Sequence, residues 1–386
     1  MCRIFDFDAL VVGAGMSGAV VARHLAENCN KKVLVIDRRN HIAGNMYDFT
    51  DENGILVQQY GPHTFHTNNK ALFDYINNFA EWQDYKLTCM AQIDGKFTPS
   101  PFNFQTIDDF FSDEEATIIK QHIKEVYDNA EKTTIVEMLD SYDPYIKKYA
   151  QFLFDKDYSL YTAKQWGISP SQIDISVLKR VPVLFSYKTG YFDDKYQVMP
   201  KHSFTDFFRS LLNHKNITVE LNVQAKSMIS IESNILYING VPAQIPVVYT
   251  GAIDELLDYK YGQLPYRSLR FDYKSINVTS FQDAPVVAYP QADGYTRITE
   301  YTKLPYQQSK DITRIAIEYP VKYSAGDTNE PYYPVLTDTS TELYNKYKHE
   351  TDAIKNLYLC GRLADFKYYN MDQALDNALN LCGKLH

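Results

Sequence analysis

A glycine-rich turn near the N-terminus constrains the fold of this chain more than any other feature. Gly13, Gly15 and Gly18 form a GxGxxG pattern between the apolar run DALVV and a helical pattern that follows. The first glycine permits a tight turn, the second lets a pyrophosphate approach the backbone, and the third lets helix and strand pack closely. The turn would also direct a helix N-terminus, the positive end of its dipole, at that anion.

A second apolar run, KKVLVID, ends at Asp37 and completes a βαβ opening. Asp37 follows Gly13 by 24 residues, where an acid would bind a ribose hydroxyl. The opening therefore predicts a dinucleotide-binding, Rossmann-like α/β domain. Strand and helix patterns of the same kind return in the middle of the chain and at its end, with a helical insert and a strand-rich insert between them.

Composition argues against several classes of protein. The net charge of -9 does not suit a surface for nucleic acid or for an anionic membrane. No run approaches the roughly 18 apolar residues that span a bilayer, and the acidic start is not a signal peptide. The five cysteines are scattered without CxxC spacing, which favours a reducing compartment over a disulfide framework or a zinc site. We therefore expect a cytoplasmic protein.

Two further segments favour FAD over NAD as the dinucleotide. Arg38 and a Gly44-Asn45 turn follow the second strand, as in the two-dinucleotide-binding flavoproteins. The late segment LYLCGRLADFKYYNMDQAL resembles their C-terminal flavin motif, in which a glycine ends a strand and a helix then faces the flavin. We expect the cofactor site to contain Gly13, Gly15, Met16, Ser17, Gly18, Asp37, Arg38, Gly44, Asn45, His63, Thr64, Val223, Gly361, Arg362, Asn370 and Met371.

Several segments together resemble one flavoprotein family, the bacterial UDP-galactopyranose mutases, over nearly the whole chain. They are, in order, YGPHTFHT, YTAKQWG, LKRVPVLFSYKTGYFDDKYQ, LPYRSLRF, YTRITEY, EPYYPV and GRLADFKYYNMDQA. The resemblance implies an isomerase that converts the pyranose ring of a nucleotide-linked hexose to the furanose, without net redox change. We take UDP-galactopyranose as the expected substrate.

The resemblance also implies the division into domains. A discontinuous Rossmann-like FAD domain would comprise residues 1–68, 203–252 and 335–386. A mainly helical domain with a mobile substrate loop would span 104–202, and a twisted antiparallel sheet domain would span 69–103 and 253–334.

A covalent mechanism follows from the same resemblance. Reduced FAD would attack the anomeric carbon through its N5 atom as UDP leaves, and the opened ring would close again through the C4 hydroxyl. Such an enzyme would need an external reductant, NAD(P)H or a reductase. The resemblance further implies a homodimer.

The resemblance assigns the substrate site as well. Arg180, on a mobile loop, and Arg297 would bind the diphosphate, which guanidinium groups contact through charge-assisted hydrogen bonds. Tyr161 would stack on the base beside Thr162 and Trp166. The other substrate contacts that the resemblance implies are Leu87, Tyr191, Arg267, Tyr333, Tyr368 and Asn370.

His63 and His66 lie three residues apart in YGPHTFHT and could serve as metal ligands, as catalytic groups or in packing. Gly61-Pro62 argues against a helical presentation of both rings, and no carboxylate or cysteine of suitable spacing joins them, so we expect no metal. The resemblance implies that His63 lies against the flavin ring and that His66 reaches the sugar pocket. Packing in the core remains the alternative.

Two departures from the family leave the sugar open. Asn370 replaces an aspartate, and apolar Leu87 stands where relatives often have a polar sugar contact. Both suit a sugar that lacks a hydroxyl, so dTDP-fucopyranose is an alternative substrate, and UDP-N-acetylgalactopyranose is another. Two rival classes are a flavin oxidase of the amine-oxidase type and a non-enzymatic binding protein of the Rab GDP-dissociation-inhibitor type.

Overall fold

The N-terminal apolar runs form the centre of a five-stranded parallel sheet in the computed structural model, which describes residues 4–128, 130–166, 182–325 and 329–385. The strand order is β12-β2-β1-β16-β22, and every neighbouring pair is parallel. All residues of β1 and β2 are buried, as expected for strands covered on both faces. The strands are β1 (Ala9–Val12), β2 (Val33–Asp37), β12 (Ile217–Leu221), β16 (Val247–Tyr249) and β22 (Leu357–Leu359).

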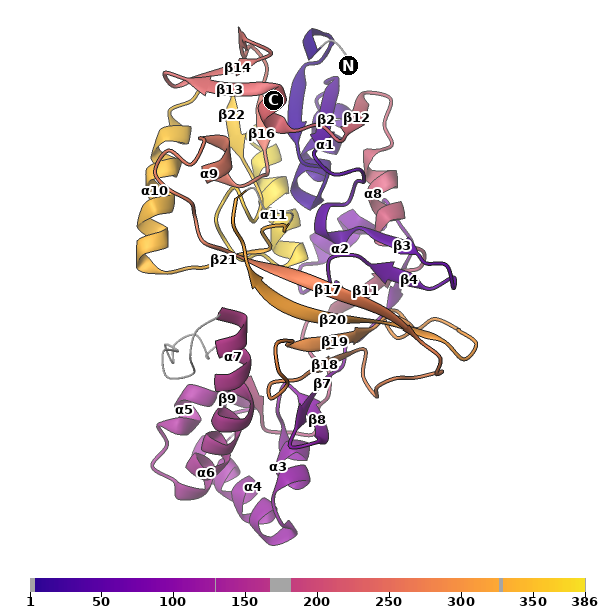
Figure 1. The fold of residues 1–386 in the computed structure, drawn as a ribbon, viewed down its shortest axis with the longest axis vertical. Helices are drawn as coiled ribbons and strands as arrows, with labels where there is room; N and C mark the ends of the chain where they lie inside the picture. Colours follow the sequence, from indigo (N-terminus) through magenta and orange to yellow (C-terminus); the bar gives the residue numbers. More distant parts are fainter. Residues whose placement is uncertain (1–3, 129, 167–181, 326–328, 386) are drawn as a thin grey trace.

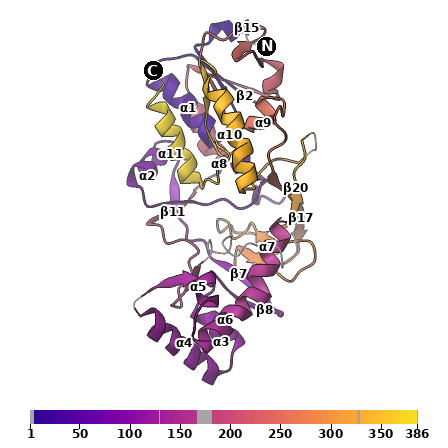
Figure 2. The ribbon, with the colours of Figure 1, turned by 90° about the vertical axis from the view of Figure 1, so that its left-hand side faces the viewer.

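Helices from both ends of the chain cover this sheet (Figures 1 and 2). α1 (Met16–Glu27) packs against α11 (Met371–Cys382) and α8 (Phe204–Leu212). The buried face of α1 is rich in glycine and alanine, which lets its backbone approach its neighbours closely. α10 (Asp338–Asp352) lies alongside the short α9 (Ile253–Leu256). The structure thus has the Rossmann-like α/β architecture that the glycine turn predicts.

A seven-stranded sheet crosses the middle of the molecule, in the order β21-β17-β20-β19-β18-β7-β8 (Figure 1). Neighbouring strands are antiparallel, except that β18 and β7 run parallel. The long pair β17 and β20 forms its spine. The strands are β7 (Cys89–Ile93), β8 (Lys96–Ser100), β17 (Tyr266–Ile276), β18 (Val286–Ala288), β19 (Arg297–Glu300), β20 (Thr313–Lys322) and β21 (Tyr333–Pro334).

A group of helices with its own apolar core lies on the far side of this sheet from the parallel one (Figure 1). Ser112, Thr134 and Asp143 cap three of these helices through side-chain oxygens that accept backbone N–H groups. A π-helical turn, Phe154–Tyr158, joins the last two helices. The helices are α3 (Phe104–Phe110), α4 (Asp113–Tyr127), α5 (Ile135–Leu139), α6 (Pro144–Leu153) and α7 (Ser159–Trp166).

Smaller elements connect these parts. β11 lies within the range predicted for the helical domain, but it pairs with β5 and β6. The short helix α2 follows β5 and packs against α11. These elements are β5 (Phe65–Thr67), β6 (Trp82–Asp84), β11 (Tyr196–Pro200) and α2 (Lys70–Asn77). None of the helices within the described ranges has both the length and the apolar character needed to cross a membrane.

Candidate functional site

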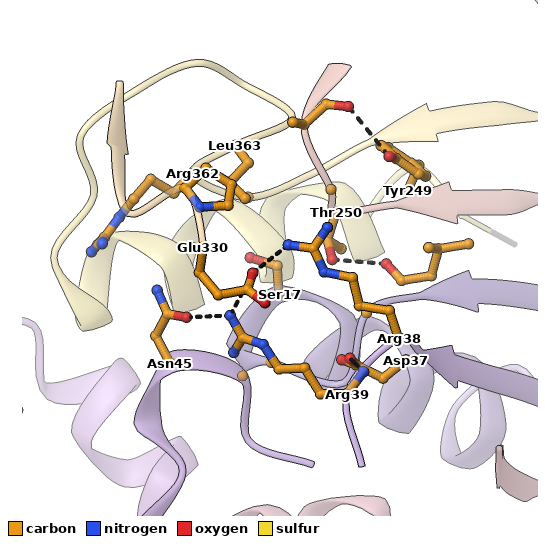
Figure 3. Close-up of a pocket in the computed structure, with 18 of the residues that line it drawn as sticks. Ser17, Asp37, Arg38, Arg39, Asn45, Tyr249, Thr250, Glu330, Arg362 and Leu363 are labelled. Carbon is orange, nitrogen blue, oxygen red and sulfur yellow. Dashed lines mark hydrogen bonds and ion pairs between the residues drawn. The ribbon is translucent and has the colours of Figure 1, made fainter. Parts of the chain in front are cut away.

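A pocket opens where β1 and β2 end, beside the N-terminus of α1 (Figure 3). Ligands of open α/β sheets bind at this edge. Two residues predicted for the cofactor site, Gly18 and Thr64, do not line the pocket. The predicted residues that do line it are Gly13, Gly15, Met16, Ser17, Asp37, Arg38, Gly44, Asn45, His63, Val223, Gly361, Arg362, Asn370 and Met371.

The three glycines of the turn have separate structural reasons. Gly13 has a φ of +107°, and a Cβ there would lie 2.0 Å from Oγ1 of Thr250. A Cβ on Gly18 would lie 1.9 Å from the carbonyl oxygen of Gly13, so Gly18 is required for close contact between helix and strand. A Cβ on Gly15 would meet only Gly44 Cα, at 3.5 Å, within the pocket wall. Gly15 therefore leaves space for a ligand, whereas Gly18 is needed for the packing of α1 against β1.

The start of α1 has the donors that a diphosphate needs. Gly15 is the N-cap, and no side chain caps the helix. The N–H groups of its first turn have no intrahelical acceptor and lie at the positive end of the dipole. Asp37 accepts from the N–H groups of Ala14 (2.8 Å) and Arg39 (2.9 Å). Since a carboxylate can accept further bonds, Asp37 can still receive a ribose hydroxyl. These residues fit a dinucleotide.

An ion-pair network forms one wall of the pocket (Figure 3). Glu330 pairs with Arg38 and, at 3.1 Å, with Arg39. Arg38 also approaches Glu255 at 3.5 Å, and Arg39 donates to Asn45 at 2.9 Å. Carboxylates therefore offset the charge of Arg38 and hold it at the pocket wall. Sequence reasoning missed Glu330 and Arg39, because Glu330 reaches the pocket from a segment almost 300 residues away from Arg38.

His63 is held in one orientation from three sides. Its N–H donates to Oε1 of Gln58 at 2.5 Å, and its carbonyl accepts from Nε2 of Gln58 at 3.1 Å. Its Nδ1 lies 2.9 Å from the carbonyl oxygen of Gly61, so Nδ1 carries the proton and Nε2 is an acceptor. Burial, with the nearby charges of Arg362 and Arg297, lowers the pKa of His63 to about 4. His63 is thus a neutral, fixed imidazole at the pocket wall.

We expect His63 to make the flavin-loaded protein less stable as the pH falls from 6.5 towards 4. The unfolded chain binds a proton to this imidazole with a pKa near 6.5, whereas the folded chain does so only near 4. His63→Gln should therefore remove about 1–2 kcal/mol of the loss in the free energy of unfolding between pH 7 and pH 5. Urea unfolding at both pH values measures this loss. The exposed His202→Gln is the matched control, and an unchanged loss in His63→Gln contradicts the burial argument.

His66 occupies a different environment, outside the lining of the pocket. The side chain of His66 is 10% exposed. Its Nδ1 lies 2.8 Å from Oδ2 of Asp194, and its ring stacks on Phe192 with centroids 3.6 Å apart. Asn68 donates to the other carboxylate oxygen of Asp194 at 2.8 Å. Asp194 therefore orients the imidazole of His66, which the sequence spacing alone did not reveal.

Arg297 lies on β19, directly opposite Glu318 on β20. Its Nε donates to Oε2 of Glu318 at 2.7 Å, and the side chain of Glu318 is 4% exposed. Burial works against the charge of Arg297, but Glu318 and the neighbouring tyrosines Tyr161 and Tyr333 outweigh it and hold its pKa well above the ordinary value. Arg297 is thus a permanent cation with two or more donors left for a ligand.

Tyrosines and a second arginine gather around Arg297. The rings of Tyr333 and Tyr368 stack with centroids 5.4 Å apart, and the guanidinium of Arg362 lies 4.9 Å and 5.5 Å from them. Arg362 donates to the backbone carbonyls of Tyr332 and Tyr369 at 3.3 and 2.5 Å. It has no carboxylate partner among the described residues. This places a second cation where the cofactor pocket meets the tyrosine cluster.

The other predicted substrate residues lie around the same cluster. Tyr191 lies within electrostatic range of Arg297 and Tyr368, and its N–H donates to the carbonyl of Leu87 at 2.8 Å. The side chain of Leu87 is 8% exposed. The guanidinium of Arg267 lies 5.9 Å from the ring of Tyr333.

Of the remaining predicted substrate residues, Tyr161 and Thr162 are described, Trp166 is described only in its backbone, and Arg180 is not described. Tyr161 and Thr162 are partly buried on α7, and Tyr161 lies within electrostatic range of Arg297. Trp166 ends α7, and its side chain is outside the described set. Arg180 falls in 167–181, also outside the described residues, so its position stays a prediction.

Comparisons with known proteins agree with the geometry. The UDP-galactopyranose mutase family model matches residues 156–368, and the model of the NAD(P)-binding Rossmann-like domain matches 11–79. A UDP-galactopyranose mutase from Mycoplasma genitalium is 36% identical over 97% of this chain and 93% of its own length. A dTDP-fucopyranose mutase from Escherichia coli is 33% identical over 98% of this chain and 97% of its own.

A solved structure has the same fold. It is the crystal structure of a reduced UDP-galactopyranose mutase, which superposes with a TM-score of 0.73 at 14% identity. The superposition covers 98% of this chain and 95% of the other. With that coverage, the matched fold includes both the parallel sheet and the seven-stranded sheet, whose strands β19 and β21 carry Arg297 and Tyr333.

Proposed function

The chain belongs to the UDP-galactopyranose mutase family and is a nucleotide-sugar mutase, and from that premise we propose that it converts UDP-galactopyranose to UDP-galactofuranose with bound, reduced FAD. One observation carries the proposal. Arg362 lines the dinucleotide pocket together with His63, and its guanidinium lies 4.9 Å from the ring of Tyr333 in the cluster around Arg297. A nucleotide-sugar diphosphate held by these cations would place its hexose next to the cofactor.

The residues that would hold FAD are those of the pocket. The N-terminus of α1 would bind the diphosphate, Asp37 a ribose hydroxyl, and Gly361, Asn370 and Met371 would face the flavin ring. When bound and reduced, the flavin supplies an electron-rich nitrogen, N5, as a nucleophile towards the anomeric carbon. Neutral His63, fixed by Gln58, would present its acceptor Nε2 without adding positive charge to this wall.

The residues of the tyrosine cluster would bind the substrate and its leaving group. Arg297 would stabilise the negative charge that develops on the diphosphate as the bond to the sugar breaks. We propose Arg180 as the second arginine that binds the diphosphate. Tyr161 would stack on the uracil. The hydroxyl groups of the stacked pair Tyr333 and Tyr368 would donate hydrogen bonds to the diphosphate and the sugar. His66, oriented by Asp194, would reach the sugar.

The identity of the sugar is the finer part of the proposal. The carbonyl of Leu87 accepts a hydrogen bond from the N–H of Tyr191, so an apolar residue neighbours a predicted sugar contact. Asn370 caps α11 at the pocket wall without a charge. These two features would also suit a deoxy sugar, so dTDP-fucopyranose is the second candidate substrate. UDP-N-acetylgalactopyranose is a third.

A direct assay tests the function. Dithionite-reduced protein is incubated separately with UDP-galactopyranose, dTDP-fucopyranose and UDP-N-acetylgalactopyranose, and furanose products are followed by chromatography and NMR. We expect the fastest turnover with UDP-galactopyranose and none with oxidised protein. No furanose from any of the three would refute the mutase proposal. Hydrogen peroxide formed from an amine by oxidised protein would instead favour the amine-oxidase type of flavoenzyme.

Asn370→Asp should lower the reduction potential of the bound flavin. A carboxylate at this position adds a negative charge to the pocket wall, and reduction of the flavin adds electrons to the same site. Asp caps a helix about as well as Asn, so the fold should be unaffected. A cost of about 1 kcal/mol corresponds to a potential about 20 mV more negative for a two-electron couple.

Spectroelectrochemistry measures this shift. Asn380→Asp, an exposed substitution on the same helix, is the matched control. A potential that rises in Asn370→Asp, or falls equally in both variants, contradicts the placement of Asn370 beside the flavin.

We also propose that the protein works as a homodimer in the cytoplasm and receives electrons from NAD(P)H or a reductase. The dimer and the electron source come from the family resemblance, and the compartment comes from the scattered cysteines. Sedimentation measurements test the homodimer, and anaerobic reduction of the bound flavin by NADPH tests the electron source.

A further inference from the structure

Lys164, in the segment YTAKQWG, makes hydrogen bonds that no part of the proposed function uses. Its Nζ donates to the backbone carbonyls of Tyr289 (2.6 Å), Ala292 (2.8 Å) and Tyr295 (2.7 Å). An ammonium group has three protons, so each has an acceptor. The side chain is partly buried, and desolvating an ammonium is costly unless it is fully paired. The arrangement is therefore a built binding site for this ammonium group.

The three carbonyls belong to the turn that joins β18 to β19. That turn closes on itself, because Tyr289 N–H donates to the carbonyl of Thr296 at 2.8 Å. Thr296 N–H donates to the carbonyl of Glu318 at 2.9 Å and so connects the turn to β20. Arg297, the first residue of β19, comes directly after it. The turn is thus rigidly connected to the strand pair that presents Arg297.

The other end of the contact lies in the helical part of the molecule. Lys164 follows Tyr161 by three residues on α7, so the two side chains lie on neighbouring positions of one helix face. α7 packs on β20 at the edge where the helical part meets the seven-stranded sheet (Figure 2). Lys164 therefore joins the element that carries Tyr161 and Thr162 to the turn that precedes Arg297.

We propose that Lys164 is a positioning residue that sets the distance between the base site on α7 and the diphosphate-binding Arg297. The inference rests on the proposed function, in which Tyr161 binds the base and Arg297 the diphosphate. In a nucleotide these two groups are linked through one ribose, so both must be held at a matching spacing. Lys164 provides that spacing through three short, charge-assisted hydrogen bonds.

Variants at Lys164 in the flavin-loaded protein test the proposal. Lys164→Met keeps the length of the side chain but removes its donors, and we expect it to bind UDP about tenfold more weakly, which is about 1.4 kcal/mol. Lys164→Arg retains the charge and the donors and should recover most of the affinity. Flavin content should equal that of the wild type in both. Calorimetry measures the affinity, and absorbance measures the flavin.

Lys156→Met is the matched control. Lys156 lies in the π-helical turn before α7. Its Nζ lies 2.9 Å from Oδ2 of Asp94, so it also joins the helical part to the seven-stranded sheet, but from an exposed position. Exposed ion pairs contribute little, so UDP affinity should stay within about twofold of the wild type. If Lys156→Met and Lys164→Met weaken UDP binding equally, Lys164 has no specific role. Any contact between the helical part and the seven-stranded sheet would then have the same effect on UDP binding.

The pH dependence of UDP binding provides a second readout. Burial lowers the pKa of Lys164 to about 8, against the opposing effect of Asp157 in the π-helical turn before α7 and Asp293 in the turn between β18 and β19. A neutral amine has two protons, so one carbonyl loses its donor. Wild-type affinity should fall about threefold between pH 7 and pH 9, and Lys164→Arg, which stays charged, should lack this fall. The same fall in both proteins overturns this part of the inference.

Hydrogen exchange separates this inference from the proposed function. The backbone amides of residues 289 and 291–296 should exchange faster in Lys164→Met than in the wild type, whether or not any nucleotide binds. Unchanged exchange there refutes the role of Lys164. If the wild type binds neither UDP nor dTDP, the proposed function fails and the spacing role fails with it, while faster exchange would still show that Lys164 holds the turn.

Discussion

Arg297→Met should lower kcat/KM for the nucleotide sugar by at least about a hundredfold, since removing one group that stabilises developing charge costs about 2.7–4 kcal/mol. The geometry explains the size of the effect. The guanidinium is charged at any working pH, and its hydrogen bond to the buried Glu318 holds it in place. Flavin content should stay at the wild-type level, because Arg297 does not line the dinucleotide pocket.

Loss of stability is the competing explanation for that result, and a double variant removes it. Arg297→Met leaves the carboxylate of Glu318 buried without its partner, which costs about 3–5 kcal/mol. Arg297→Met with Glu318→Gln carries no buried charge and should recover most of this stability while remaining inactive. Arg270→Met, an exposed arginine of the same sheet, should retain activity. An active double variant would show that Arg297 has only a structural role.

Gly18→Ala should have the largest effect on the fold itself. The new Cβ would lie 1.9 Å from the carbonyl oxygen of Gly13 and 3.2 Å from a methyl of Val11. Both are parts of the central strand and its turn, so neither can move without shifting the sheet. We expect a loss of at least about 3 kcal/mol in the free energy of unfolding, together with loss of flavin.

Two other glycines provide matched comparisons. Gly15→Ala has an allowed φ of -85° and only an ordinary contact with Gly44 at 3.5 Å, so the fold should persist while FAD affinity falls. Gly54→Ala places its Cβ in open space at a φ of +78°, so it should cost only about 1 kcal/mol and keep the flavin. Thermal unfolding and flavin absorbance measure all three. If Gly18→Ala is no more destabilised than Gly54→Ala, the contact between α1 and β1 is looser than described.

The predictable part of the cofactor site came from local patterns. GxGxxG, the apolar strands beside it and Asp37 lie close together in sequence, and their spacing is dictated by one strand–turn–helix unit. Most residues predicted from these patterns line the pocket. Gly18 does not, because its requirement is packing. The wall formed by Glu330 could not be predicted, since nothing near Arg38 in the sequence indicates a carboxylate that arrives from the other end of the chain.

Local sequence patterns were enough to predict a Rossmann-like dinucleotide site and the motifs of a nucleotide-sugar mutase. They were enough because backbone geometry and apolar periodicity act over a few residues. Which charged groups meet depends instead on how the chain folds back on itself. Strand register sets Arg297 opposite Glu318, a turn brings Gln58 onto His63, and domain packing delivers three carbonyls to Lys164. Lys164 and the carbonyl of Tyr289 are 125 residues apart in the sequence, and even Gln58 and His63, five residues apart, meet only because of the turn between them. No pattern of residue types encodes these pairings.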